Sequence, residues 1–194
     1  MKRLNNYNSY KEYLFHQAEK TTDLNRRKKW LGNEWPIKLD GFKTLFESKG
    51  DILDDCKDAL CIGARTGQEV VALKELGYNA IGIDIIPCEP HVVQCDMHKL
   101  FFEDSSFDFV FSNVFDHSLY PEKKCSEIER VLRPNGIVMM HFQVNVSQDK
   151  YTEVIIENID TDVVSLFQQC QVVSSGFIKQ NFAAMNYELV LRKN

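Results

Sequence analysis

Short apolar runs alternate with helix-like segments after residue 58, and this alternation limits the fold more than any other feature of the chain. The runs ALCIG, AIGIDII, HVVQC, FDFVFSNVF and GIVMMHFQV are separated by segments of helical period. Strands that alternate with helices form a mostly parallel sheet with helices on both faces. We therefore predict a doubly wound α/β fold.

Both ends of the chain depart from this alternation. Near the C-terminus a helix-like segment, TDVVSLFQQC, precedes two strand-like runs, QVVSSGFI and AAMNYELVLR, whose close spacing predicts an antiparallel hairpin. Near the N-terminus Tyr10, Tyr13 and Gln17 fall at helical spacing. We predict one structural domain in two parts: a helical segment over 1–57 that packs on or covers the site, and an α/β domain over 58–194.

Composition agrees with one ordinary globular domain of 194 residues, 44% hydrophobic and 26% charged. A net charge of −5 gives no global attraction to nucleic acid, although the cluster of Arg26, Arg27, Lys28 and Lys29 offers a local phosphate contact. A solvated helix end is the simpler interpretation of that cluster. No apolar stretch approaches the roughly 20 residues of a membrane helix, and the first residues lack a signal peptide's apolar core, so we predict a cytosolic protein.

The six cysteines show no C-x-x-C spacing, and several lie in apolar runs, which predicts reduced, buried thiols. Cys88, His91 and Cys95 have side chains that bind metals. No second ligand pair of zinc-like spacing accompanies them, so we predict no metal site.

The best-specified local structure is the first strand-to-helix junction, ALCIGARTGQEVVALKELGY. It places Gly63 and Gly67 in the turn and predicts a helix closed by Gly77. Thr66 and Glu69 have the spacing of a capping box, which starts the helix at this turn with free backbone N–H groups that suit a carboxylate or phosphate. The glycines predict that a ligand lies close against the backbone.

Two acids follow at the ends of the next strands. Asp84 lies 84 − 63 = 21 positions beyond Gly63, where a carboxylate can accept both ribose hydroxyls of an adenosine; the alternative is a turn cap before Pro87. Asp96 closes the third strand at the crevice edge, where it can accept from an adenine amino group while Met97 covers the ring. The fourth strand, FDFVFSNVFDHS, then brings polar side chains to the same edge.

Four segments in this order resemble the class I S-adenosylmethionine-dependent methyltransferases: LCIGARTG, GIDI, CDMHKLFFEDSSFDFVFSN and EIERVLRPNGIVMMHF. The resemblance runs from Asp58 to the C-terminus. GARTGQEVVALKELG, SNVFDHSLYPEK and EIERVLRPNG are further similar to methyltransferase-like proteins known mainly from plants. The resemblance implies a seven-stranded sheet of order 3-2-1-4-5-7-6 with a final reversed hairpin and S-adenosylmethionine as cofactor. The predicted cofactor contacts are Gly63, Ala64, Arg65, Thr66, Gly67, Asp84, Ile85, Asp96, Met97 and Asn113.

Two positions depart from the family pattern. The family usually has an acid just before the first glycine, but this chain has Cys61 there. Arg65 likewise stands where the family usually has its middle glycine. The first change removes a partner for the cofactor's charged amino end. Arg65 either points its side chain away from the cofactor or meets the cofactor's carboxylate. A binding module that has lost catalysis therefore stays open as an alternative.

Methyl transfer from a sulfonium mainly requires alignment of the acceptor with the donor. Where the acceptor must lose a proton, His117 is the predicted base, and Asp116 either orients its imidazole or caps the helix that begins at Pro121. His98 and His141 are ambiguous, since a histidine with a satisfied hydrogen bond is the more common case.

We predict transfer to an oxygen, nitrogen or sulfur atom of a small molecule. RNA or protein is the alternative acceptor, with the basic cluster as its support. Trp30 and Trp35 either line an acceptor pocket or pack in the core. A nicotinamide dehydrogenase is disfavoured, because the G-x-x-x-G turn lacks that family's glycine spacing.

Overall fold

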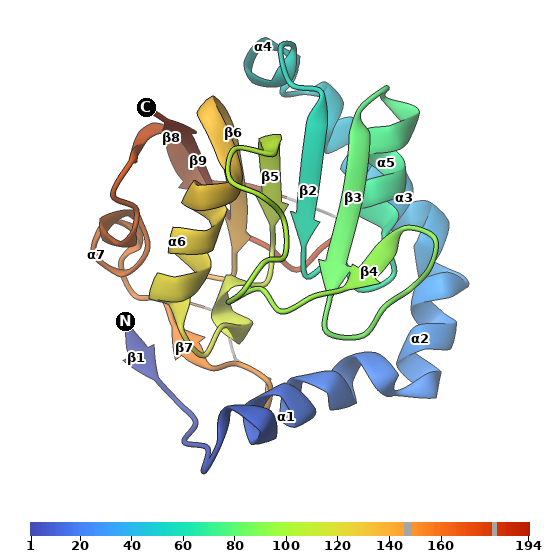
Figure 1. The fold of residues 1–194 in the computed structure, drawn as a ribbon. Helices are drawn as coiled ribbons and strands as arrows, with labels where there is room; N and C mark the ends of the chain where they lie inside the picture. The colour runs from blue at the N-terminus through green and yellow to red at the C-terminus, as the bar shows by residue number, and fades with distance from the viewer. Residues whose placement is uncertain (146–148, 180–181) are drawn as a thin grey trace.

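The apolar runs form one seven-stranded sheet in the computed structural model, which describes residues 1–145, 149–179 and 182–194 (Figure 1). Its order, β4-β3-β2-β5-β6-β9-β8, is the predicted order 3-2-1-4-5-7-6, and the fold class is confirmed. The first five strands are parallel, while β9 runs antiparallel to both neighbours. The strands are β2 (Asp58–Ile62), β3 (Asn79–Asp84), β4 (Val92–Gln94), β5 (Phe107–Ser112), β6 (Leu132–Phe142), β8 (Cys170–Phe177) and β9 (Tyr187–Lys193).

Helices cover both faces of the sheet because its central strands are apolar on both sides. On one face lie α3 (Glu34–Glu47) and α5 (Gln68–Glu75), and on the other lies α6 (Pro121–Val131), which begins at the predicted proline. Phe46 of α3 meets Phe109 and Phe111 of β5 edge to face, at ring-centroid distances of 5.9 and 5.3 Å. This packing fixes the N-terminal helices against the sheet.

The N-terminal helices continue from the sheet face to the carboxyl ends of the strands. Helix α1 (Tyr10–Thr22) crosses below the ends of β2 and β3 in Figure 1, and α2 (Leu24–Leu31) leads from it to α3. A short α4 (Gly50–Leu53) precedes β2. Strand β1 (Lys2–Arg3) pairs with β7 (Val154–Ile155) in a separate two-stranded sheet.

The C-terminal part confirms the predicted hairpin and corrects the helix before it. Strands β8 and β9 pair antiparallel. The predicted single helix over TDVVSLFQQC is wrong: a one-turn α7 (Ile159–Asp162) and a 3-10 turn η2 (Val164–Leu166) take its place. The break falls at Val163, a fully buried β-branched residue with a φ of −126°.

Helix α5 also begins differently from the prediction. The cap is Gly67, with a left-handed φ of 92°, and no side chain caps the helix. Thr66 Oγ1 instead donates to Gln68 Oε1 at 2.9 Å, so the predicted capping box is wrong. Gly77 closes the helix as predicted, with its N–H donating to the Lys74 carbonyl at 3.1 Å.

Among the described residues, no helix combines the length and the apolar character needed to cross a membrane.

Candidate functional site

The glycine turn is required by the protein's own packing. Gly63 has a φ of +78°, and a Cβ there would lie 2.2 Å from Val114 Cγ2. At Gly67, with a φ of +92°, a Cβ would lie 2.9 Å from His91 Cβ. Left-handed backbone and these two side chains already require glycine at both positions, and the close approach of a ligand stays a prediction.

Asp84 ends β3 and ties the glycine turn to the next loop. Its Oδ2 accepts from the Arg65 N–H at 3.1 Å, and its Oδ1 accepts from the Ile86 N–H at 3.0 Å. Burial raises the pKa of this carboxyl, although Arg65 and the backbone donors oppose that shift. Each carboxylate oxygen keeps a lone pair for a further donor, so Asp84 can still accept two hydroxyl hydrogens.

Asp96 is already hydrogen-bonded to the N-terminal helix. Tyr10 OH donates to Asp96 Oδ2 at 2.7 Å, and the backbone N–H and ring Nδ1 of His98 meet Oδ1 at 2.9 and 3.0 Å. Burial alone would raise the pKa of Asp96, but these contacts outweigh burial and hold it below its usual value. Because His98 Nε2 also bonds Ser118 Oγ at 2.7 Å, this histidine is a satisfied structural residue.

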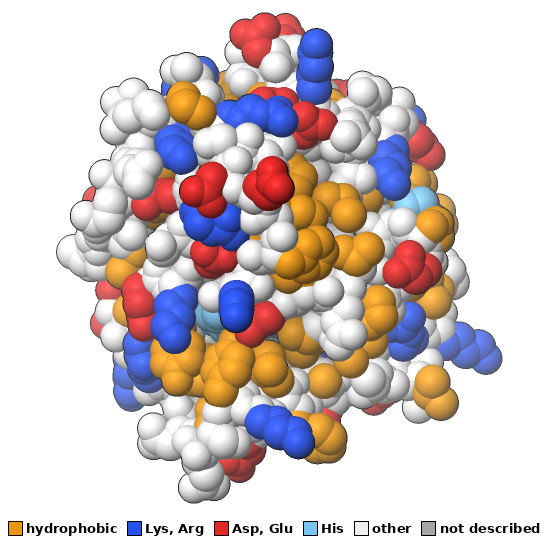
Figure 2. All heavy atoms as spheres, viewed as in Figure 1, with side chains coloured by type: hydrophobic (Ala, Val, Ile, Leu, Met, Phe, Trp, Pro, Cys, Tyr) orange, Lys and Arg blue, Asp and Glu red, His pale blue; other side chains and the backbone are white. Residues whose placement is uncertain are grey.

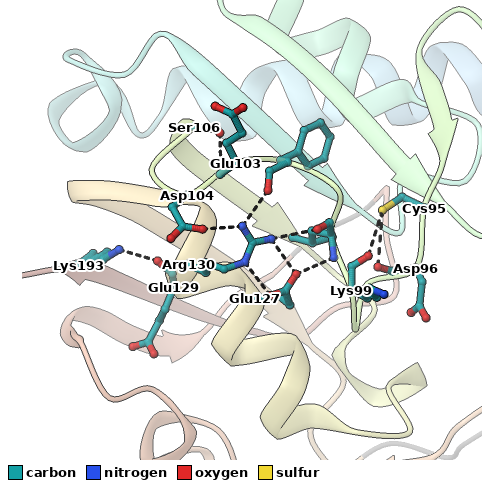
Figure 3. Close-up of polar contacts among 12 residues, drawn as sticks. Cys95, Asp96, Lys99, Glu103, Asp104, Ser106, Glu127, Glu129, Arg130 and Lys193 are labelled. Atoms are coloured by element: carbon teal, nitrogen blue, oxygen red, sulfur yellow. Dashed lines mark hydrogen bonds and ion pairs between the residues drawn. The ribbon is translucent and has the colours of Figure 1, made fainter.

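An arginine clamp holds the segment that carries Asp96 (Figure 3). The Arg130 guanidinium of α6 makes two bonds to Glu127, at 2.8 and 2.9 Å. It also donates to the carbonyls of Leu100 and Phe102 at 3.0 and 2.8 Å. Five donors in a rigid fork suit this role, and the clamp fixes the loop after β4 to α6.

Two cavities open at the carboxyl ends of the strands, and they share Gly63, Arg65, Lys20 and His117. The smaller, which we call the adenosine-side cavity, has a volume of about 50 Å³. The larger, which we call the chamber, has a volume of about 540 Å³. Every predicted site residue except Gly67 lines one of them. The adenosine-side cavity is lined by Gly63, Arg65, Asp84, Ile85, Asp96, Met97 and His117, and the chamber by Gly63, Ala64, Arg65, Thr66, Asn113, Asp116 and His117.

His117 closes η1 (Phe115–His117) and lies between the cavities. Its Nδ1 bonds the Tyr151 carbonyl at 2.7 Å, and because a carbonyl only accepts, Nδ1 carries the proton. Its Nε2 therefore accepts from Lys20 Nζ at 3.1 Å. Burial lowers the pKa of His117, Asp116 opposes this shift, and the Lys20 charge adds to it, so the neutral imidazole is favoured.

Asp116 and Asn113 both line the chamber, but Asp116 takes neither of the two roles predicted for it, capping α6 or orienting the imidazole by a hydrogen bond. The residue before α6 is Tyr120, and no side chain caps that helix. Asp116 Oδ2 lies 3.9 Å from His117 Nε2, too long for a hydrogen bond. The imidazole is oriented by the Tyr151 carbonyl instead.

Three residues that line the chamber were not predicted to belong to the site. Lys20 of α1 bridges His117 and Asp149, with its Nζ 2.8 Å from Asp149 Oδ2, and burial lowers its pKa against the opposing effect of Asp149. Glu69 is 5% exposed, and burial raises its pKa to about 7. Gln68 bonds the Trp30 carbonyl at 3.0 Å. Lys20 was not predictable, since it comes from 97 residues before His117.

Arg65 and Trp30 form one wall of the chamber. Arg65 has a left-handed φ of 53°, and its guanidinium carbon lies 4.6 Å from the Trp30 ring centroid. Its side chain therefore stays at the junction of the two cavities. Trp35 is absent from the residues lining either cavity within the described ranges.

A buried lysine lies beneath the strand ends. Lys124 of α6 is fully buried, and its Nζ donates to Ser112 Oγ at 3.0 Å. Ser112 Oγ in turn donates to the Ile62 carbonyl at 3.2 Å, which ties the ends of β5 and β2 together. Burial lowers the pKa of Lys124 to about 8. Lys124 therefore stabilises the strand ends that carry the site.

Of the other ambiguous residues, His141 is not among the described residues that line either cavity. His141 is buried and bonds Glu188 Oε2 at 3.0 Å. In the described part of the chain, Cys88, His91 and Cys95 do not belong to a cluster that could hold a metal ion. Of the basic cluster, Arg26 lines the chamber, with its guanidinium carbon 5.6 Å from the Tyr151 ring centroid.

On the face shown in Figure 2, Lys and Arg side chains are interspersed with Asp and Glu, and apolar side chains lie between them. This mixed charge on that face differs from the continuous basic stripe of many nucleic-acid-binding domains.

Comparison with known proteins gives the chemistry of this fold. Residues 60–140 match a family described as a methyltransferase domain. No curated protein matches the chain, so the closer similarity to plant methyltransferase-like proteins stays a prediction. A methyltransferase domain makes the chain an enzyme, and its cofactor is S-adenosylmethionine.

Solved structures share the fold at low sequence identity. The 1,6-didemethyltoxoflavin-N1-methyltransferase of Burkholderia thailandensis, solved with 1,6-didemethyltoxoflavin and S-adenosylhomocysteine bound, has a TM-score of 0.72 and 15% identity; the alignment covers 98% of this chain and 93% of that one. A methyltransferase of Archaeoglobus fulgidus has a TM-score of 0.61 and 16% identity, with coverage of 86% and 97%. A Pyrococcus horikoshii protein has a TM-score of 0.66 and 18% identity, with coverage of 90% and 95%.

Proposed function

Starting from an S-adenosylmethionine-dependent methyltransferase domain, we propose that the enzyme methylates an oxygen, nitrogen or sulfur atom of a small molecule held in the chamber. The observation that carries this proposal is the chamber itself. A volume of about 540 Å³ lies in the range of small-molecule sites, roughly 300–1,000 Å³. Helices α1, α2 and α3 contribute its walls through Lys20, Trp30 and Phe42. We propose that the segment 1–57 forms the cover of the site.

The residues present fit the cofactor in their chemistry. Asp84 has lone pairs for the ribose hydroxyls, and Ile85 and Met97 supply apolar walls for an adenine ring. The adenosine-side cavity of about 50 Å³ is too small for a nucleoside, so α1 must shift when the cofactor binds. Asp96 would then exchange its Tyr10 hydrogen bond for one from the adenine amino group.

We assign the acid–base role to His117 and a supporting role to Asp116. When bound, S-adenosylmethionine supplies an activated methyl group on its sulfonium. His117 Nε2 is the acceptor atom of a neutral imidazole and takes the proton that a hydroxyl, thiol or ammonium acceptor loses. For this to happen Lys20 must leave Nε2, and Asp149 already binds the same ammonium at 2.8 Å. Asp116 then stabilises the imidazolium electrostatically.

RNA is the second candidate acceptor, because Arg26 of the basic cluster lines the chamber. A module without catalysis is the third, because Cys61 and Arg65 depart from the family pattern. A cytosolic location, which was predicted from the sequence, belongs to the same proposal.

The test is methyl transfer from isotopically labelled S-adenosylmethionine to separate pools of small metabolites, total RNA and total protein. We expect label in a small-molecule fraction, and a loss of at least tenfold in His117→Gln, within the range of acid–base catalysis. Glu34→Gln is the matched control: Glu34 lines the chamber but is already paired with Lys29 and Lys38. Label in RNA, with loss on reversing the charge of Arg26, would contradict a small acceptor; binding without any transfer would favour the third alternative.

A further inference from the structure

Glu69 is a buried carboxylate that the proposed reaction does not use. It is the second residue of α5, it is 5% exposed, and it lines the chamber beside the glycine turn. In the described part of the chain no lysine or arginine lies within 4.0 Å of its carboxylate, and its own backbone N–H donates to it. A buried carboxylate without a cationic partner is unfavourable, which points to a partner that arrives from the chamber.

The position of Glu69 explains how the chain does without an acid on its first strand. Cys61 of β2 is fully buried, and burial raises the pKa of its thiol well above the usual value. The carboxylate of Glu69, which lies in the first turn of the helix after this strand, raises that pKa further. The strand thus lacks an acid, while the helix that follows it brings one to the chamber beside Gly63, Ala64 and Arg65.

The charged groups around Glu69 do not neutralise its carboxylate at close range. Arg65 of the glycine turn and Lys38 of α3 attract the ionised carboxylate, and Asp84 of β3 repels it. Neither cation is available as a close partner, because Arg65 lies over Trp30 and Lys38 pairs with Glu34 at 2.8 Å.

We propose that Glu69 binds the α-ammonium of the cofactor's methionine part. It takes over this role from the acid that the family usually has on the first strand, where this chain has Cys61. This inference rests on the proposed function, since it concerns the same cofactor. The cation has the right chemistry because an ammonium donates up to three charge-assisted hydrogen bonds to a carboxylate. The location is right because Gly63, Ala64 and Arg65 line the chamber together with Glu69.

A dependence on pH follows from this pairing. Burial holds the pKa of free Glu69 at about 7, against the attraction of Arg65 and Lys38. An ammonium partner favours the ionised form, so cofactor binding releases a proton below pH 7 and weakens as the pH falls.

The experiment compares two ligands by calorimetry. S-adenosylhomocysteine carries the ammonium, and 5′-methylthioadenosine lacks it. We expect Glu69→Gln to weaken binding of the first by about 10- to 100-fold and of the second by less than about twofold. Glu75→Gln is the control and should change neither, because Glu75 of the same helix pairs with Lys43 at 3.1 Å and is not among the described residues that line the two cavities. Equal affinity of Glu69→Gln and the wild type for S-adenosylhomocysteine would overturn the inference, even if the variant lost methyl transfer.

Two further measurements separate this inference from its alternatives. At pH 6.5, the binding heat of S-adenosylhomocysteine to the wild type should depend on the ionisation enthalpy of the buffer, and the heat for Glu69→Gln should not. The double variant Cys61→Asp, Glu69→Gln should regain affinity by returning the acid to the strand. Absence of the buffer effect in the wild type contradicts the inference regardless of how the variants fold. Failure of the wild type to bind either ligand contradicts the proposed function instead.

Discussion

The two cavities meet at the same strand ends but are built in different ways. The adenosine-side cavity is formed mainly by residues next to their own strand, such as Asp84 after β3 and Asp96 after β4. The chamber is formed by side chains from distant segments, among them Lys20 of α1, Trp30 of α2 and Gln143 after β6. The first depends on local sequence and the second on tertiary packing, so substitutions in the two should fail in different ways.

The largest effect is expected at the turn that the cavities share. Gly63→Ala should lower the free energy of unfolding by about 4 kcal/mol, because the Cβ meets Val114 and the backbone is left-handed. Gly77→Ala is the control: it has a φ of +95° and open space, and should cost about 1 kcal/mol. Urea unfolding measures both. Equal costs would mean that packing against Val114 is not the reason for Gly63.

Next in size is the loss of the ribose acceptor. Asp84→Asn should weaken binding of S-adenosylhomocysteine and of 5′-methylthioadenosine alike, by roughly 100-fold, because both carry the ribose. Glu69→Gln should distinguish the two ligands, so the pair of variants separates the adenosine side from the chamber. Calorimetric titration of each ligand is the measurement. A variant of Asp84 that affected only S-adenosylhomocysteine would contradict this division.

A smaller effect is expected in the chamber at Lys20. Lys20→Met should raise the pKa of His117, because the ammonium 3.1 Å from Nε2 disfavours the imidazolium. As the folded pKa lies below the unfolded value, the wild type should lose stability as the pH falls from the ordinary histidine range to that lower value, and the variant should lose less. Imidazole NMR titration reads the shift, with Lys150→Met as the control. An unchanged His117 pKa would show that Lys20 does not control this imidazole.

The smallest effect is expected where α1 covers the adenosine side. Tyr10→Phe removes the hydrogen bond to Asp96 and should cost about 1 kcal/mol of stability, while S-adenosylhomocysteine associates faster because α1 shifts more easily. Tyr7→Phe removes a bond from the same N-terminal region to Glu153 and serves as the control. Stopped-flow binding would show the difference, and equal association rates in the two variants would argue against a shift of α1.

The difference between features set by local sequence and features set by tertiary packing also decides what the sequence could predict. The hairpin and the start of α6 followed from apolar runs and Pro121, because these signals are local, whereas the sheet order was implied by the resemblance to class I methyltransferases. The helix predicted over TDVVSLFQQC failed because Val163 is buried against the core in a non-helical conformation. The capping box failed because Gly67 adopts a left-handed conformation that the pattern of Thr66 and Glu69 does not encode.

For the site, position along a strand predicted which residues line the cavities but not their partners. Asp96 was predicted to accept from an adenine amino group, yet in the structure it accepts from Tyr10, which lies 86 residues earlier in the chain. Lys20 likewise reaches His117 through packing of α1, which carries no motif. Glu69 had a visible signal, since it follows a glycine turn whose strand lacks its acid at Cys61, but its burial follows from α3 and α5 packing together.

The most direct test of the central claim is calorimetric titration of S-adenosylhomocysteine into the wild-type protein, with NADH as the comparison ligand. We expect one binding site per chain for S-adenosylhomocysteine and no heat of binding for NADH. Binding of NADH alone, or of neither ligand to the folded protein, would contradict the assignment of the two cavities to S-adenosylmethionine and its acceptor.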